Sequence, residues 1–131
     1  MAIQEILVVD DDRDNLNLLR QILECEGMSV GCAVSAEDAL AKLTDRTYSL
    51  MLTDLNMPGL NGIALARRAS VIAPHMPVFL MTGDISPDTP QMAKEAGIAV
   101  VLNKPFYPAQ LLQVIREQCL QQSPVPEQLP C

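Results

Sequence analysis

Five short runs of apolar residues recur along the chain, and most of them are apolar at every position rather than at every second one. They occupy residues 6–9, 30–34, 50–52, 78–81 and 98–102, and the second, which contains Gly31, is the weakest. A strand that is apolar on both sides is buried on both faces, which is typical of a parallel sheet. The pattern therefore predicts five parallel strands.

Segments with helical periodicity lie between and after these runs. Leu16, Leu19 and Leu23 recur at helical spacing and indicate a helix with one buried face. Residues that favour helix ends mark the expected boundaries. Helix starts are indicated by Ser35 for the second helix, Asn61 for the third (residues 61–72), Ser86 and Pro87 for the fourth, and Pro108 for the fifth. Helix ends are indicated by Gly27 for the first and Gly97 for the fourth.

Alternating strands and helices predict an α/β domain with helices on both faces of the sheet. Five such units, (βα)5, favour the doubly wound flavodoxin-like fold with strand order 2-1-3-4-5. We expect this single domain to span residues 1–121. Residues 122–131 contain three prolines and few residues that could pack, so we expect a disordered Pro-rich C-terminal tail.

Composition excludes several classes of protein. Half of the residues, 49%, are hydrophobic, which excludes a wholly disordered chain, and no apolar run approaches the ~20 residues that cross a bilayer. We expect a cytoplasmic protein without membrane association. Nine Lys and Arg against sixteen Asp and Glu, a net charge of −7, argue against direct nucleic-acid binding. The four cysteines have no metal-ligand spacing and indicate reduced thiols.

The chemistry is predicted at the carboxyl ends of the strands, where open parallel sheets bind ligands. The first strand is followed by Asp10, Asp11 and Asp12, and the third by Asp54. The switch point of a 2-1-3-4-5 sheet lies between these two strands, so the carboxylates should converge there. Carboxylate oxygens that leave room for water suit Mg²⁺. Asp12 can instead be the cap of the following helix, and we favour that role.

Two further strand ends contribute Thr82 and Lys104. The site would then contain three parts: a metal ion held by the carboxylates, the hydroxyl of Thr82 and the ammonium of Lys104. Together they suit a group that carries negative charge on oxygen. Asp54 in this setting is a candidate nucleophile that accepts a phosphoryl group, a known use of aspartate.

Four separated stretches at these strand ends resemble the receiver domains of bacterial two-component response regulators. They read ILVVDDD at residues 6–12, TDLNMPG at 53–59 with Asn61-Gly62 following, MTG at 81–83 and NKPF at 103–106. The resemblance covers about residues 4 to 121. It implies that Asp54 is the phospho-acceptor, that Thr82 is the switch hydroxyl, and that Lys104 pairs with the phosphoryl group.

The resemblance also implies a ligand set for Mg²⁺. Asp11 would bind the ion directly, Asp10 mainly through water, and Asn56 through its backbone carbonyl, beside Asp54. Asn56 and Asp84 would tune how fast water removes the phosphoryl group.

Two positions near the last strand complete the comparison. The bond between Lys104 and Pro105 is expected to be cis, as it is in this family. The family usually has Tyr or Phe three residues before the lysine, whereas this chain has Val101. Valine cannot repeat the ring's change of rotamer, so the output is either weaker or runs through the loop after the fourth strand and its helix.

We therefore expect a switch rather than a turnover enzyme. A histidine kinase or phosphotransfer protein would phosphorylate Asp54, and the surface of the fourth helix, fifth strand and fifth helix would change and signal to a downstream effector protein. The chain would be a single-domain regulator or the receiver of a hybrid kinase, and two copies could pair as a homodimer. The alternative is a small Mg²⁺-dependent phosphohydrolase with an aspartyl-phosphate intermediate, which many turnovers on phosphate monoesters would reveal.

Overall fold

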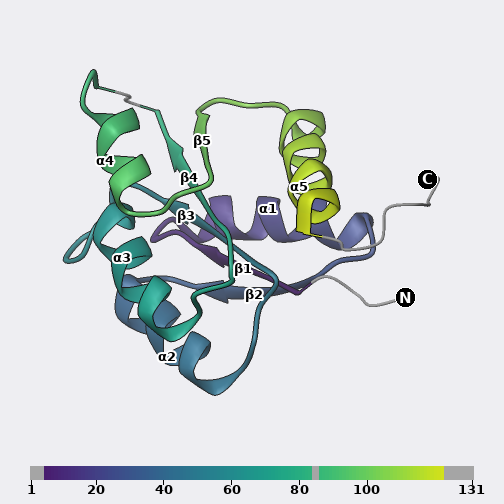
Figure 1. Ribbon diagram of the computed structural model, residues 1–131. Helices are drawn as coiled ribbons and strands as arrows, with labels where there is room; N and C mark the ends of the chain where they lie inside the picture. The colour runs from purple at the N-terminus through teal and green to yellow at the C-terminus, as the bar shows by residue number, and fades with distance from the viewer. Residues whose placement is uncertain (1–4, 84–85, 123–131) are drawn as a thin grey trace.

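A computed structural model describes residues 5–83 and 86–122 of the chain, in which strands and helices alternate strictly (Figure 1). The strands are β1 (Glu5–Val9), β2 (Ser29–Ala33), β3 (Leu50–Asp54), β4 (Val78–Thr82) and β5 (Val100–Asn103). The helices are α1 (Arg13–Cys25), α2 (Ala36–Asp45), α3 (Gly62–Ile72), α4 (Thr89–Glu95) and α5 (Pro108–Gln122).

The strands form one parallel sheet in the order β2-β1-β3-β4-β5, which confirms the predicted topology. The register pairs Val9 with Thr53, Asp54 with Met81, and Thr82 with Asn103. The carboxyl ends of four neighbouring strands, β1, β3, β4 and β5, therefore lie together at one edge of the sheet. The loops that follow these strands carry the candidate chemistry.

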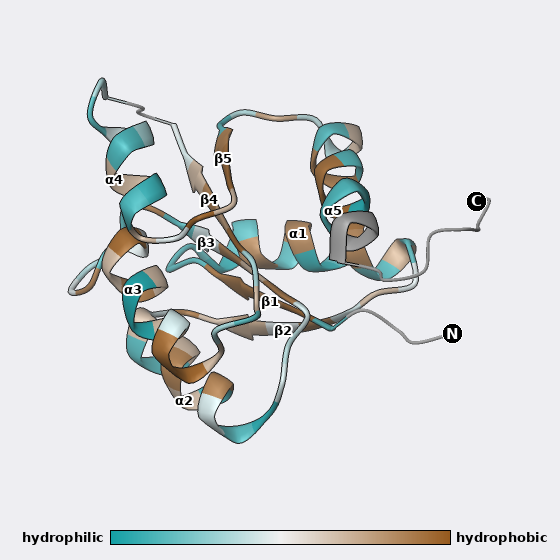
Figure 2. Cartoon of the chain, viewed as in Figure 1, coloured by the Kyte–Doolittle hydropathy of each residue, from teal (hydrophilic) through white to brown (hydrophobic). Residues whose placement is uncertain are grey.

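Helices cover both faces of the sheet, α1 and α5 on one and α2, α3 and α4 on the other (Figure 1). Successive side chains of β1 show the division, because Leu7 packs into the core under α2 and α3 whereas Val8 packs into the core under α1 and α5. The strands are mostly hydrophobic and the helices are mixed (Figure 2). Burial of a large side chain such as Phe79, fully inaccessible to solvent, contributes roughly 1.5–3 kcal/mol.

Side-chain caps begin the three helices that precede α4. Asp12 accepts hydrogen bonds from the backbone N–H groups of Asp14 and Asn15, and Asn61 accepts one from Ala64. Ser35 accepts one from the N–H of Asp38, as expected, while the Asp38 carboxylate accepts from the N–H of Val34. These caps satisfy backbone donors that have no partner within the helix.

Glycines end α1 and α4 as predicted. Gly27 and Gly97 have φ angles of 86° and 82°, in the left-handed region that glycine adopts without strain. After Gly97 the N–H of Ile98 bonds back to the carbonyl of Ala93 and closes the last turn of α4. Because this donor belongs to the helix end, β5 begins at Val100 rather than at residue 98.

The predicted start of the fourth helix was wrong. Ser86 does not cap it and Pro87 is not its first residue, since α4 runs from Thr89 to Glu95 with Pro90 in its first turn. The N–H of Thr89 bonds to the carbonyl of Ser86, which closes a turn with Pro87 at its second position. Proline suits that position as well as it suits a helix start, so local sequence did not distinguish the two.

Two expectations fall on residues that the structure does not describe, namely the tail beyond Gln122 and the tuning residue Asp84. Within the described ranges, no helix is both long and apolar enough to cross a membrane.

Candidate functional site

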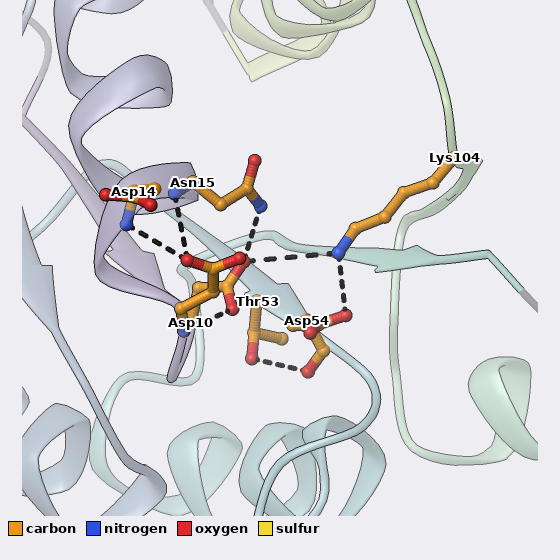
Figure 3. A network of polar contacts seen from close by, with 7 residues as sticks. Asp10, Asp14, Asn15, Thr53, Asp54 and Lys104 are labelled. Atoms are coloured by element: carbon orange, nitrogen blue, oxygen red, sulfur yellow. Dashed lines mark hydrogen bonds and ion pairs between the residues drawn. The ribbon is translucent and has the colours of Figure 1, made fainter.

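Two buried carboxylates define the site at the carboxyl edge of the sheet. Asp10 directly follows β1, is only 1% exposed, and is held by a backbone hydrogen bond to Ala33 of the neighbouring strand. Asp54 is the last residue of β3 and is 9% exposed. Since β1 and β3 are adjacent, the two side chains lie side by side (Figure 3).

Asp11 completes a group of three carboxylates. Ligand atoms of Asp10, Asp11 and Asp54 all lie within 4.8 Å of one another, and Asp11 is exposed to solvent. Asp12 is the N-cap of α1, in line with the role that we favoured from the sequence. The structure thus brings together three of the four carboxylates that the sequence placed at this edge.

Lys104 reaches the carboxylates from the loop after β5. Its Nζ lies 3.2 Å from Oδ1 of Asp54 and 4.0 Å from Oδ2 of Asp10 (Figure 3). The backbone N–H of Lys104 donates to the carbonyl of Thr82, which ties the ends of β4 and β5 together. The bond between Lys104 and Pro105 is cis, as the resemblance implied.

The pKa of Asp54 is raised above its usual value, chiefly because burial disfavours the charged carboxylate. The Lys104 ammonium opposes this effect, and the neighbouring Asp10 carboxylate reinforces it. Three carboxylates therefore face one ammonium. This imbalance makes the group a favourable environment for a further cation.

The donor set fits Mg²⁺, a hard ion that prefers oxygen ligands and retains several waters. Two of the carboxylates are anchored by buried strands, and exposed Asp11 faces the solvent from which hydrated ions arrive. Asp10, Asp11 and Asp54 are the side chains that would hold the ion.

The remaining predicted residues surround this centre. Thr82 is fully buried at the end of β4. Asn56 is exposed in the loop after β3, two residues beyond Asp54. Val101 is half-buried in β5, pairs with Leu80, and packs on the core beneath α2, α3 and α4.

Two residues that shape the site had no role assigned from the sequence: Asn15 was not singled out, and Gly62 was quoted only as part of a motif. Asn15 donates from its side-chain amide to Oδ2 of Asp10 at 2.5 Å. Gly62 begins α3 against the backbone of Asp54, where a Cβ would clash with the Asp54 carbonyl oxygen. The signal for Asn15 was its place three residues after the cap Asp12, because side chains in the first helical turn point back toward the preceding strand end.

Comparison with known proteins identifies the family. The family model of the response regulator receiver domain matches residues 6–116, and the chain belongs to this family. The solved structure of a CheY-like response regulator receiver domain protein from Methanospirillum hungatei JF-1 superposes with a TM-score of 0.89 at 34% identity, covering 92% of this chain and 97% of that one.

Two curated relatives belong to larger proteins. The C4-dicarboxylate transport transcriptional regulatory protein DctD of Rhizobium meliloti is 33% identical over 88% of this chain and 25% of its own length. The virulence sensor protein BvgS of Bordetella bronchiseptica is 40% identical over 86% of this chain and 10% of its own length. The chain thus spans a quarter or less of these two relatives. The comparisons do not favour the phosphohydrolase alternative.

Proposed function

We propose that this receiver domain is a phosphorylation-controlled switch whose acceptor is Asp54. The observation that carries the proposal is the buried Asp54 carboxylate, grouped with Asp10 and Asp11 and 3.2 Å from the Lys104 ammonium. The donor would be the phosphohistidine of a histidine kinase or phosphotransfer protein.

In the transfer, a carboxylate oxygen of Asp54 forms a bond to phosphorus while the bond between phosphorus and the histidine nitrogen breaks. The histidine leaves with the electron pair of that bond, and Asp54 becomes an acyl phosphate. Asp11, Asp54 and the backbone carbonyl of Asn56 would hold Mg²⁺ directly and Asp10 would hold it mainly through water, and the bound ion would supply positive charge to the phosphoryl oxygens. Lys104, already beside Asp54, would pair with one of those oxygens.

The switch would act through Thr82 and the α4-β5-α5 surface. Thr82 ends β4, and its carbonyl accepts a backbone hydrogen bond from Lys104, so the main chains of the two residues are linked. A phosphoryl group would bias a two-state equilibrium of this surface, which a downstream effector protein or a second copy of the chain would read. Val101 packs inward as an aliphatic side chain, which favours transmission through the loop after β4 and through α4.

Each molecule of the domain would be phosphorylated about once, on its own Asp54, whereas an enzyme would turn over many substrate molecules. Asn56 and Asp84 would set how fast water removes the phosphoryl group. Signalling by protein contact, without direct nucleic-acid binding, agrees with the net charge of −7. A cytoplasmic location remains a prediction.

A groove beside the site offers a place for the donor protein. It has a volume of about 300 Å³, and Lys104 both lines the groove and forms the ion pair with Asp54. Its other lining residues come from α1, from the segment between β5 and α5, and from the first residue of α5: Asn15, Leu18, Leu19, Ile22, Pro105, Phe106 and Pro108. A donor that rests here would bring its phosphohistidine to Asp54.

The decisive experiment measures the intact mass of the protein after incubation with acetyl phosphate, with and without Mg²⁺. We expect one added phosphoryl group on the wild type, dependent on Mg²⁺, and none on Asp54→Asn. A turnover assay on a generic phosphate monoester should give no sustained product. Equal labelling of Asp54→Asn would show that the acceptor is another residue.

A further inference from the structure

Within the described part of the chain, the carboxylate of Asp10 has two hydrogen-bond donors and one more distant cation around it. Oδ1 accepts from the backbone N–H of Asp12 at 3.0 Å. Oδ2 accepts from the side-chain amide of Asn15 at 2.5 Å, a contact that Figure 3 shows. The Lys104 Nζ lies farther from Oδ2, at 4.0 Å. A neutral amide is therefore the nearest side-chain donor to a charge that is 1% exposed.

We propose that Asn15 is a positioning residue for Mg²⁺, a role that rests on the proposed function of the carboxylate group. Its amide holds the Asp10 carboxylate in one orientation and leaves the negative charge available. A lysine or arginine in the same place would also orient the carboxylate, but its positive charge would compete with the ion. An amide avoids that competition.

The geometry of α1 supports this role, because the helix holds Asn15 in a fixed place. Asn15 is the third helical residue, and its own backbone N–H donates to the cap Asp12. The next residue, Leu16, and Leu19 one turn later are buried against the sheet. A half-buried side chain on an anchored first turn has few alternative positions, as a residue that orients a metal ligand requires.

The chain offers a matched control on the same helix. Asn17 is two residues farther along and exposed, and its side-chain oxygen accepts from Arg20 at 3.4 Å, so Asn17→Ala removes an asparagine from α1 without touching Asp10. Asn15→Leu keeps the branched outline and the number of side-chain heavy atoms of asparagine and removes the donor. Asn15→Ala removes both.

The experiment titrates the full chain with MgCl₂ by isothermal calorimetry, after circular dichroism has established that each variant is folded. We expect Asn15→Ala and Asn15→Leu to weaken Mg²⁺ binding about tenfold or more, the usual effect of losing a partner of a metal ligand. Asn17→Ala should bind as the wild type does. Labelling of the Asn15 variants by acetyl phosphate should return to the wild-type rate at saturating Mg²⁺.

The outcomes separate this inference from the proposed function. Wild-type affinity in both Asn15 variants, or in Asn15→Leu alone, would overturn the positioning role while leaving Asp54 as acceptor. A labelling rate that stays low at saturating Mg²⁺ would also overturn it. Mg²⁺ binding that depends on Asn15 in a protein that acetyl phosphate never labels would support the inference and contradict the proposed function.

Discussion

Asp54 is buried next to a like charge, and the Lys104 ammonium at 3.2 Å compensates only part of the cost. The net result is a raised pKa, with burial as the largest cause. A carboxyl group that protonates more readily in the folded state than in the unfolded state reduces stability once it ionises. The proposed acceptor is thus a residue that the fold holds at the expense of stability.

Asp54→Asn should therefore stabilise the metal-free protein at neutral pH. Below the unfolded pKa of about 3.9, Asp54 is protonated in both states and the substitution gains nothing. As the pH rises toward the raised folded pKa, the unfolded state ionises first, the wild type loses stability, and the advantage of the substituted protein grows to its full value. Urea unfolding without Mg²⁺ at pH 4 and pH 7 measures the difference.

Asp88→Asn is the matched control for this experiment, since it removes the same charge from an exposed residue whose side chain makes no cap hydrogen bond. Its effect should be small at both pH values. A loss of stability in Asp54→Asn at pH 7 would mean that the ion pair with Lys104 outweighs the cost of burial.

At the scale of elements, the junction between β3 and α3 depends on close backbone contact. The N–H of Gly62 donates to the carbonyl of Leu55 at 2.9 Å, so the first turn of α3 folds back onto the end of β3. A Cβ at Gly62 would meet the Asp54 carbonyl oxygen and lie 2.8 Å from Cδ1 of Leu80. The side chain of Leu80 can move aside, but the backbone of a central strand cannot.

Gly62→Ala should destabilise the protein by about 1–3 kcal/mol, the usual cost of overpacking, and should slow labelling of Asp54 because its backbone is displaced. Chemical unfolding and intact mass after incubation with acetyl phosphate measure the two effects. Gly83→Ala is the control, because a Cβ there would lie 3.8 Å from Cβ of Lys104, an ordinary contact. Equal stability of the two variants would show that the β3–α3 junction can relax.

At the scale of the whole molecule, the groove beside Lys104 joins the site to an exposed apolar residue. Leu18 lies on α1, lines the groove and is 55% exposed. A protein donor would cover this residue, whereas a small donor such as acetyl phosphate would not need to. Phosphorylation by the two kinds of donor should therefore respond differently to a change at Leu18.

Leu18→Asp should slow transfer from a phosphorylated histidine phosphotransfer protein about tenfold relative to labelling by acetyl phosphate, as expected for a central apolar contact worth about 1–2 kcal/mol. The ratio of the two rates, measured by intact mass, tests this. Val71→Asp, at the far end of α3 and 82% exposed, adds the same charge to another aliphatic position and should leave the ratio unchanged. An equal fall in both rates for Leu18→Asp would place the effect in the site itself.

The hydrophobic pattern alone determined the architecture of this protein. Strands that are apolar on both sides must be covered on both faces, so five apolar runs, most of them apolar at every position, predicted a parallel sheet between layers of helices. Five such units favoured the doubly wound order 2-1-3-4-5, which the structure confirms. The same reasoning predicted which strand ends would meet, and therefore that Asp10, Asp11, Asp54 and Lys104 would lie close together, as the structure shows. Helix ends with a single physical explanation, such as Gly27 and Gly97, were also predictable.

Tertiary structure alone decided the contacts between segments that are far apart or ambiguous. Whether Pro87 began a helix or occupied a turn depended on the hydrogen bond between Ser86 and Thr89, since proline suits both. The need for a glycine at position 62 arises where α3 packs against the end of β3, and the groove beside Lys104 arises where α1 meets the segment between β5 and α5. Periodicity specifies which face of an element is buried, but the distance between two side chains depends on how the elements pack.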